Sequence, residues 1–141
     1  MKAYHHGNLK KELIKIACKL CERDGYTKLS IRSLAKESKV SQTAPYRHFK
    51  TKEDLYAAIT KEGFDKLNKE MLSIKAKNPK TYLINCGKSY IDFGLENANT
   101  YDLMFGTAVG NYADYPELSE SANNLFQILL SNFKKLSSDN D

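Results

Sequence analysis

The segment that decides the fold is residues 41–52, whose sequence is SQTAPYRHFKTK. We expect a short helix here, capped by Ser41, because serine is favoured at helix N-caps. Its polar side chains can form hydrogen bonds with the base edges and phosphate oxygens of DNA. Phe49 gives the same helix an apolar side that can anchor it. One short helix cannot bind DNA alone, so the neighbouring segments decide whether this interpretation holds.

Two further helices are predicted before this segment. Asn8 can cap a first helix that runs to about Asp24 and is ended by Gly25. Ser30 can cap a short second helix whose apolar residues share one face. A tight turn at Lys39 then leads into the third helix. This order is that of a helix-turn-helix unit with a supporting helix in front of it.

The remainder of the chain is also predicted to be helical, and strand signals are nearly absent. Thr51 and Asp54 form a capping-box pattern at the start of a long fourth helix. Three more helices are predicted, with starts at Asn78-Pro79, Asn99 and Pro116. The expected fold class is therefore all-α. We expect a helix-turn-helix domain over residues 1–50 and a second helical domain over residues 51–141.

Charge is distributed unevenly along the chain, whose net charge is +5. Residues 1–52 contain thirteen Lys and Arg against four acidic residues, a net charge of +9. Residues 53–141 contain nine Lys against thirteen acidic residues, a net charge of −4. A concentrated cationic region of this kind favours a polyanionic partner. On charge alone, the alternative is a solvated basic surface without a partner.

The composition is that of an ordinary globular protein, with 41% hydrophobic and 28% charged residues. No apolar run is long enough to cross a bilayer, and the N-terminus lacks the apolar core of a signal peptide. The three cysteines are an odd number in no pattern that demands pairing, which favours reduced thiols. We therefore expect a cytoplasmic protein that does not bind membranes.

Four motifs together resemble those of the TetR family of transcriptional regulators. They are His5-His6-Gly7-Asn8-Leu9 before the first helix, Leu29-Ser30-Ile31-Arg32 at the second, Val40 to Phe49 at the third, and Lys52-Glu53-Asp54-Leu55 at the fourth. The strong resemblance covers residues 5 to about 60, and a weaker one covers residues 101–106. It implies a DNA-binding regulator, a repressor released by a small ligand, which acts as a homodimer on palindromic double-stranded DNA.

The resemblance also implies roles for individual side chains. Those expected to face base edges in the major groove are Gln42, Thr43, Ala44 and Arg47. Those expected to contact phosphates are Ser30, Arg32, Ser41, Tyr46, His48 and Lys52. The chemistry agrees, because a helix N-terminus attracts phosphate and one arginine can bond both O6 and N7 of guanine.

By the same resemblance, residues 51–141 would form an effector-binding and dimerisation domain. The candidates for an effector pocket are Tyr82, Cys86, Tyr90, Phe93, Tyr101, Met104, Phe105 and Tyr112. For each single residue the alternative is a plain helical core, because aromatic side chains at helical spacing usually serve packing. As a group they indicate an apolar pocket.

Three features depart from the family pattern. Lys39 stands where the family usually has glycine, a strain of about 1–2 kcal/mol if the left-handed turn is kept. Pro45 falls inside the recognition helix, where it removes one backbone hydrogen bond. The sequence also stops after the seventh predicted helix and contains no Trp, so we expect the last two family helices to be lacking here. Three alternatives explain this: a truncated protein, a sequence that records only an ordered fragment, or dimerisation that is built differently.

Other functions are compatible with some residues. Cys18 and Cys21 have CxxC spacing, but no second Cys or His pair stands at zinc-finger distance. Core packing is therefore favoured over a metal site or a thiol-dependent enzyme. His5-His6 favours a flexible basic arm near DNA. The alternative to a regulator is a basic helical protein-interaction module without sequence-specific DNA reading. We predict no enzyme activity, no cofactor and no metal.

Overall fold

The computed structural model describes residues 8–138, which fold into helices without any β-strand. The α-helices are α1 (Leu9–Asp24), α2 (Ile31–Ser38), α3 (Lys52–Leu72), α4 (Pro79–Glu96), α5 (Ala98–Phe105) and α6 (Pro116–Ser138). Short 3-10 helices are η1 (Tyr26–Lys28), η2 (Pro45–Arg47) and η3 (Tyr112–Asp114). The predicted all-α fold class, a helix-turn-helix unit followed by a helical part, is confirmed. The predicted His5-His6 arm lies outside the described residues.

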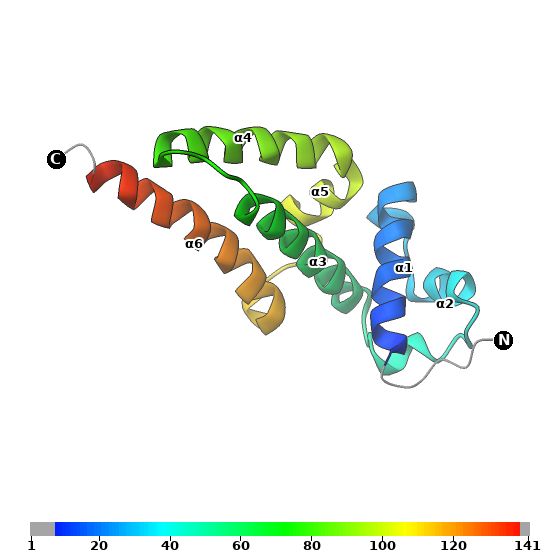
Figure 1. Cartoon of the computed structure of the whole chain (residues 1–141). Coiled ribbons are helices and arrows are strands. Elements are labelled where there is room, and N and C mark those ends of the chain that lie inside the picture. The colour runs from blue at the N-terminus through cyan, green and yellow to red at the C-terminus, as the bar shows by residue number, and fades with distance from the viewer. Residues whose placement is uncertain (1–7, 139–141) are drawn as a thin grey trace.

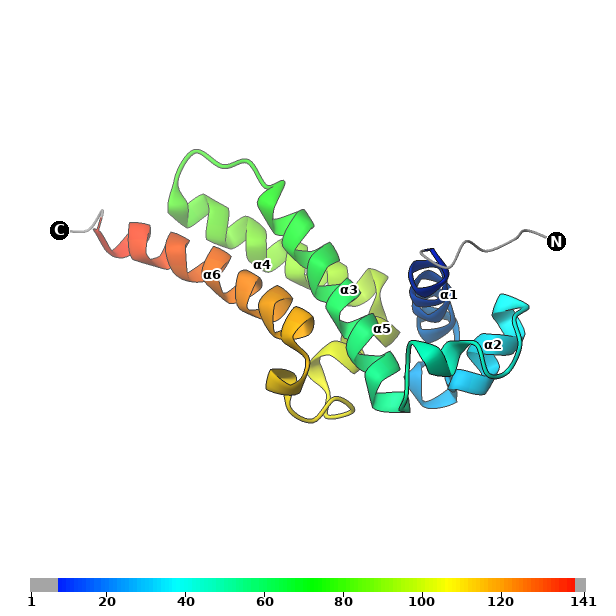
Figure 2. The ribbon, with the colours of Figure 1, turned by 90° about the horizontal axis from the view of Figure 1, so that it is seen from below.

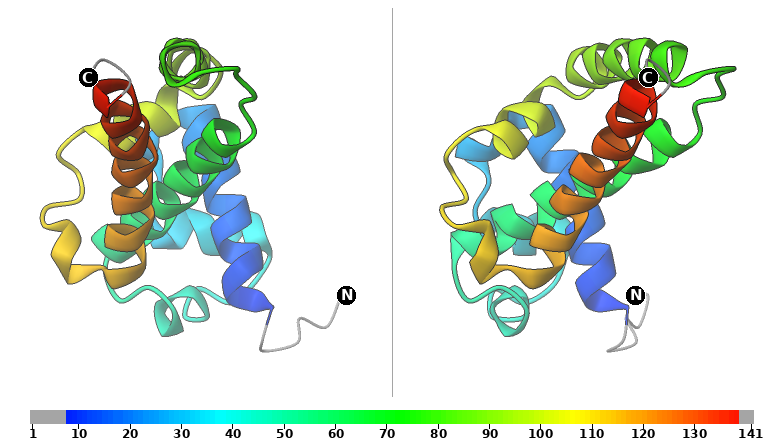
Figure 3. Two further views of the ribbon diagram at one scale, coloured as in Figure 1. Left: turned by 60° about the vertical axis from the view of Figure 1, so that its left-hand side comes forward. Right: turned by 90° about the vertical axis from the view of Figure 1, so that its left-hand side faces the viewer.

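Helix α3 lies at the centre of the molecule. Helices α1 and α2 lie at one end of it, and α4 and α6 extend toward the other end (Figures 1 and 2). Helices α3, α4 and α6 pack on one another as a bundle (Figure 3). Helix α5 contacts both α1 and α3. The helix-turn-helix unit is therefore joined to the rest of the chain through α3 and α5.

Local sequence signals set most of the helix boundaries. Gly25 has φ 84° and ends α1, as glycine can adopt this conformation without strain. Ser30 and Thr51 each form the capping box at the start of α2 and α3, respectively. The side chain of Asn78 accepts a hydrogen bond of 2.9 Å from the N–H of Thr81, with proline at the first helical position. These predicted starts are confirmed.

The predicted third helix is wrong in type, because its regular part is the 3-10 helix η2. Pro45 has no N–H, so it cannot donate the i→i−4 bond to the carbonyl of Ser41 that would close an α-helical turn. The N–H of Ala44 donates to that carbonyl instead, at 3.1 Å, and His48 N–H donates to Pro45 O at 3.0 Å. The hydroxyl of Ser41 lies 3.4 Å from that of Thr43 and forms no cap bond with backbone N–H.

Two asparagines do not cap the helices they were expected to cap. Helix α5 begins at Ala98, and the side chain of Asn99 donates a 2.7 Å hydrogen bond to the carbonyl of Glu22 in α1. Asn8 precedes α1, but its side chain makes no cap hydrogen bond. The side chain of Asn99 thus bonds to a residue distant in the sequence instead of capping its own helix, and a local sequence pattern does not reveal such a partner.

One hydrophobic core connects both ends of the molecule. Its largest fully buried apolar side chains are Phe49, Phe93, Leu13, Leu34, Leu55, Ile59, Leu67, Met71, Leu103, Met104 and Leu118. Gly63 lets α3 and α5 approach closely, since a Cβ at this position would overlap the side chain of Met104. Within residues 8–138, no helix combines the length and the apolar character needed to cross a bilayer.

Candidate nucleic-acid interface

Residues 42–48, here named the recognition turn, carry all four predicted base-reading residues. Gln42, Thr43 and Arg47 are exposed to solvent, and Ala44 is half-buried. Pro45 is the buried member of the turn. The polar tips therefore point out of the molecule, while the proline holds the turn against it. Such an arrangement can present hydrogen-bonding groups to the edges of bases in a groove.

The two ends of the recognition turn are held in different ways. After it, Phe49 is only 2% exposed and belongs to the hydrophobic core. Before it, Lys39 adopts the left-handed conformation, with φ 56° and ψ 37°. Its N–H donates to Lys36 O at 3.2 Å, which ends α2 and turns the chain toward the recognition turn. The left-handed conformation expected at Lys39 is confirmed.

The predicted phosphate-contacting residues surround the same end of the molecule. Those exposed to solvent are Arg32, Ser41, Tyr46 and Lys52. His48 and Ser30 are half-buried, and the hydroxyl of Ser30 accepts a 2.9 Å hydrogen bond from the N–H of Ser33. Ser30 therefore serves first as a helix cap, with its hydroxyl already engaged by the backbone.

The carboxylate of Glu22 connects α1 to α5, a role that sequence reasoning missed. It accepts hydrogen bonds from the N–H of Thr100 at 3.0 Å and from its hydroxyl at 2.9 Å. A carboxylate near a helix N-terminus is favoured by the orphan N–H groups and the helix dipole. No local pattern near Glu22 in the sequence indicates a partner 78 residues away.

Three of the eight effector-pocket candidates form an aromatic cluster between α4 and α5. The hydroxyls of Tyr90 and Tyr101 are 2.7 Å apart. The ring of Phe105 lies 5.8 Å from that of Tyr90 and 4.7 Å from that of Tyr101, measured between centroids. Burial, followed by the hydrogen bond to Tyr101, raises the pKa of Tyr90 to about 12. The structure thus brings these three together.

The other pocket candidates serve packing and backbone contacts. The hydroxyl of Tyr82 donates to the carbonyl of Met71 at 2.7 Å, and that of Tyr112 donates to the carbonyl of Met104 at 2.6 Å. Candidates with fully buried side chains are Cys86, Phe93 and Met104. Of all eight, Phe93 is the one that lines a cleft between α1 and α3.

Cys21 and Cys86 are buried, and Cys18 is half-buried. Burial raises the pKa of Cys18 to about 12 and that of Cys21 to about 11. Both thiols therefore stay protonated at neutral pH and are poor nucleophiles. Within the described part of the chain, no three potential metal-binding side chains gather at one place.

The sequence matches one family model and one curated protein. Residues 13–59 match the model of the family described as bacterial regulatory proteins, tetR family. Over 73 residues the chain is 37% identical to YuxN, an uncharacterized helix-turn-helix-type transcriptional regulator of Bacillus subtilis strain 168. That match covers 50% of the chain and 25% of YuxN, so the chain spans about a quarter of this curated relative.

Solved structures resemble the chain over most of its length. A protein of unknown function from Rhodococcus sp. RHA1 superposes with a TM-score of 0.82 at 25% identity, covering 100% of this chain and 74% of that one. The TetR-family transcriptional regulator PfmR from Thermus thermophilus gives a TM-score of 0.67 at 18% identity, covering 91% of this chain and 71% of PfmR. Residues 13–59 thus match the tetR-family model, and the fold of the chain over most of its length is that of the solved TetR-family regulator PfmR.

Proposed function

We propose that this protein is a sequence-specific DNA-binding regulator of transcription. The observation that carries the proposal is the recognition turn, in which Gln42, Thr43 and Arg47 are exposed together. Their backbone is fixed by buried Pro45 and Phe49, so the side chains can enter a major groove without a large ordering cost. The net charge of +9 in residues 1–52 adds sequence-independent attraction to phosphates.

In the proposed mechanism the protein is a repressor, and a small ligand bound in the C-terminal helical part releases it from DNA. The ligand would favour one orientation of α3 and thereby change the distance between two recognition turns. A duplex requires half-sites one helical turn apart, ~34–36 Å. Helix α3 suits this role because it begins four residues after the recognition turn and contacts α4, α5 and α6.

A homodimer is part of the proposal. Helix α4 exposes Ile84 by 51%, Ile91 by 61% and Leu95 by 76%, and α6 exposes Phe126 and Phe133. Exposed apolar side chains gathered on neighbouring helices favour a protein partner. A second copy of the chain would cover this surface and place two recognition turns on one palindromic operator.

We also propose that the protein is not an enzyme and works in the cytoplasm. The thiols considered as nucleophiles have pKa values raised by burial to about 12 for Cys18 and about 11 for Cys21. All three cysteines are free, in keeping with a reducing compartment.

The test compares two single substitutions by fluorescence anisotropy on a panel of DNA sequences. Arg47→Ala is expected to relax the preference at one base position by about 1–3 kcal/mol. Lys52→Ala is expected to weaken all sequences alike and to lower the salt slope by about one unit. Lys75→Ala removes the same charge at an exposed position after α3 and serves as the control.

Unchanged DNA binding in both Arg47→Ala and Lys52→Ala would overturn the proposal. Binding that ignores DNA sequence and weakens only with salt would instead favour a basic helical interaction module. Such a module needs positive charge but no ordered arrangement of Gln42 and Arg47.

A further inference from the structure

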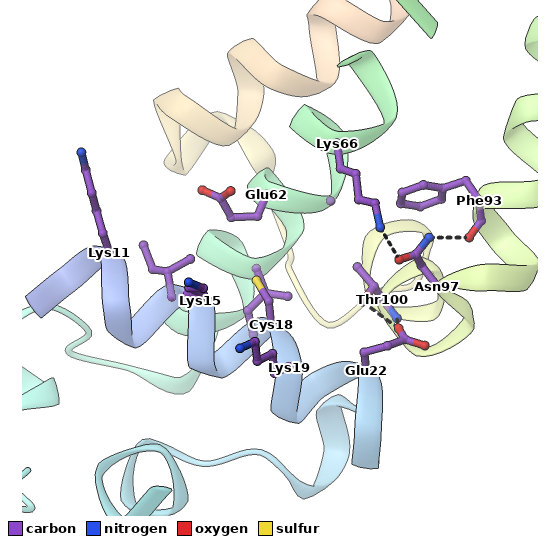
Figure 4. A pocket seen from close by; sticks show the side chains of 13 residues that line it. Lys11, Lys15, Cys18, Lys19, Glu22, Glu62, Lys66, Phe93, Asn97 and Thr100 are labelled. Carbon is purple, nitrogen blue, oxygen red and sulfur yellow. Dashed lines mark hydrogen bonds between the residues drawn. The ribbon is translucent and has the colours of Figure 1, made fainter. Parts of the chain in front are cut away.

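A cleft of about 660 Å³ opens between α1 and α3, with residues of α4 and α5 at one end (Figure 4). Its volume lies within the range of small-molecule sites, about 300–1,000 Å³. The basic residues that line it are Lys11, Lys15, Lys19 and Lys66. The apolar residues that line it are Ile14, Cys18, Ile59 and Phe93. The cleft thus combines an apolar floor with a cationic rim.

Three of these lysines form a row along α1. Lys11, Lys15 and Lys19 are spaced four residues apart, so like charges are neighbours on one helix face, which is unfavourable for the helix. Within residues 8–138, none of the three has a carboxylate within 4.0 Å. Their charges are therefore not neutralised by the protein itself.

The opposite wall of the cleft carries one more cation and an aromatic ring. The ammonium of Lys66 on α3 donates a 2.9 Å hydrogen bond to Asn97 Oδ1 and lies 6.0 Å from the centroid of the Phe93 ring (Figure 4). The bond to a neutral amide leaves the charge of Lys66 unpaired. This places positive charge on both walls.

The two acidic residues of the cleft are already engaged. Glu22 accepts the two hydrogen bonds from Thr100, and Glu62 lies 3.7 Å from Lys61. At the floor, burial and the nearby carboxylate of Glu62 raise the pKa of Cys18 to about 12, so the thiol is neutral. The thiol of Cys18 is uncharged, and the four lysines of the lining outnumber its two carboxylates, so the net charge of the lining is positive.

We propose that this cleft binds a small amphipathic anion. Its apolar tail would lie over the half-buried side chains of Ile14 and Cys18, with buried Ile59 and Phe93 next to them, and its carboxylate head would meet Lys15 and Lys19. The site is separate from the aromatic cluster of Tyr90, Tyr101 and Phe105, none of which lines the cleft. Binding of an anion in this cleft would require no contact with DNA, so this site goes beyond the proposed function.

Calorimetric titration of the full chain with decanoate tests both halves of the proposed chemistry. Acetate carries the head without the tail, and decyltrimethylammonium carries the tail with the opposite charge. We expect decanoate alone to bind. Heat of binding from decyltrimethylammonium equal to that from decanoate, or none from decanoate, would overturn the proposal.

Two double variants with the same loss of charge test the lysines. Lys15→Gln/Lys19→Gln changes the cleft, whereas Lys75→Gln/Lys77→Gln changes exposed lysines between α3 and α4 that do not line it. We expect the first to weaken decanoate binding by about tenfold or more, since hydrogen bonds to charged groups contribute that much, and the second by less than about twofold. Equal losses in both would show that the anion is held by net charge, not by the cleft.

Isoleucine methyl spectra locate the bound anion without any substitution. Ile14 and Ile59 line the cleft, whereas Ile84 and Ile91 lie on the exposed apolar face of α4. Decanoate is expected to shift the signals of Ile14 and Ile59 and to leave those of Ile84 and Ile91 unchanged. The reverse pattern would assign the anion to the apolar face and overturn the proposal.

Discussion

The recognition turn and helix α3 follow each other in the chain but are stabilised in different ways. Helix α3 is 21 residues long and buries side chains along its whole length, among them Leu55, Ile59 and Leu67. The recognition turn has a single 3-10 turn and exposes most of its side chains. A segment that presents polar groups to a partner has little apolar surface to bury, so a few anchors must fix it.

This contrast predicts the largest effect at an anchor. Phe49→Ala is expected to lower the free energy of unfolding by about 3–5 kcal/mol, because it leaves a cavity where a fully buried ring was. Tyr46→Ala removes a ring that is 50% exposed and is expected to change stability by only about 0.5 kcal/mol. Urea denaturation measures both. Similar losses in the two variants would contradict an anchored turn.

The next effect tests the packing of α3. In Gly63→Ala the new methyl group would overlap Met104, and Thr100 Cγ2 would lie 3.2 Å away, so we expect a loss of about 1–3 kcal/mol. Gly87→Ala in α4 is the control, because its methyl group would have no neighbour within 4 Å. That change should raise stability by about 0.5–1 kcal/mol, as alanine is the better helix former. Thermal unfolding of both variants measures these changes. A Gly63→Ala variant that is more stable than the parent would contradict the close approach of α3 and α5.

A smaller gain is expected at the entry to the recognition turn. Lys39→Gly should stabilise the protein by about 0.5–1 kcal/mol, because glycine adopts the left-handed conformation without the strain of a side chain. Lys36→Gly, in the regular part of α2, should destabilise it by about 1 kcal/mol. The opposite signs can be read from denaturation midpoints. A loss in both variants would indicate that Lys39 is not strained.

The smallest effect concerns the thiol that α1 buries beside α3. The pKa of Cys18 is about 12 in the folded chain, against an ordinary value of 9.0, so its protonated form is favoured by folding. Stability is therefore complete below pH 9 and falls as pH rises toward 12, with a loss of about 0.4 kcal/mol at pH 9. Denaturation at pH 7 and pH 9 should show a smaller pH-dependent loss in Cys18→Ala than in the parent. Equal losses would place that thiol in water.

The sequence predicted α3 better than the recognition turn for physical reasons. Thr51 with Asp54 is a local signal, and the observed cap bonds involve only these two residues. Pro45 lacks an N–H, and the 3-10 geometry observed there bonds to the third carbonyl back instead of the fourth, a difference that a polar helical pattern does not reveal. The contacts of Glu22 with Asn99 and Thr100 join residues that only the tertiary fold brings together. The lysine row of α1 was visible in the sequence, but the cleft beneath it was not.

The most direct test of DNA reading by the recognition turn is selection of bound DNA from a random pool, with light scattering on the same complex. The proposed regulator predicts an inverted-repeat consensus with half-sites one helical turn apart, bound by two copies of the chain. A pool that shows no enriched sequence, although the protein retains DNA at low salt, would contradict it.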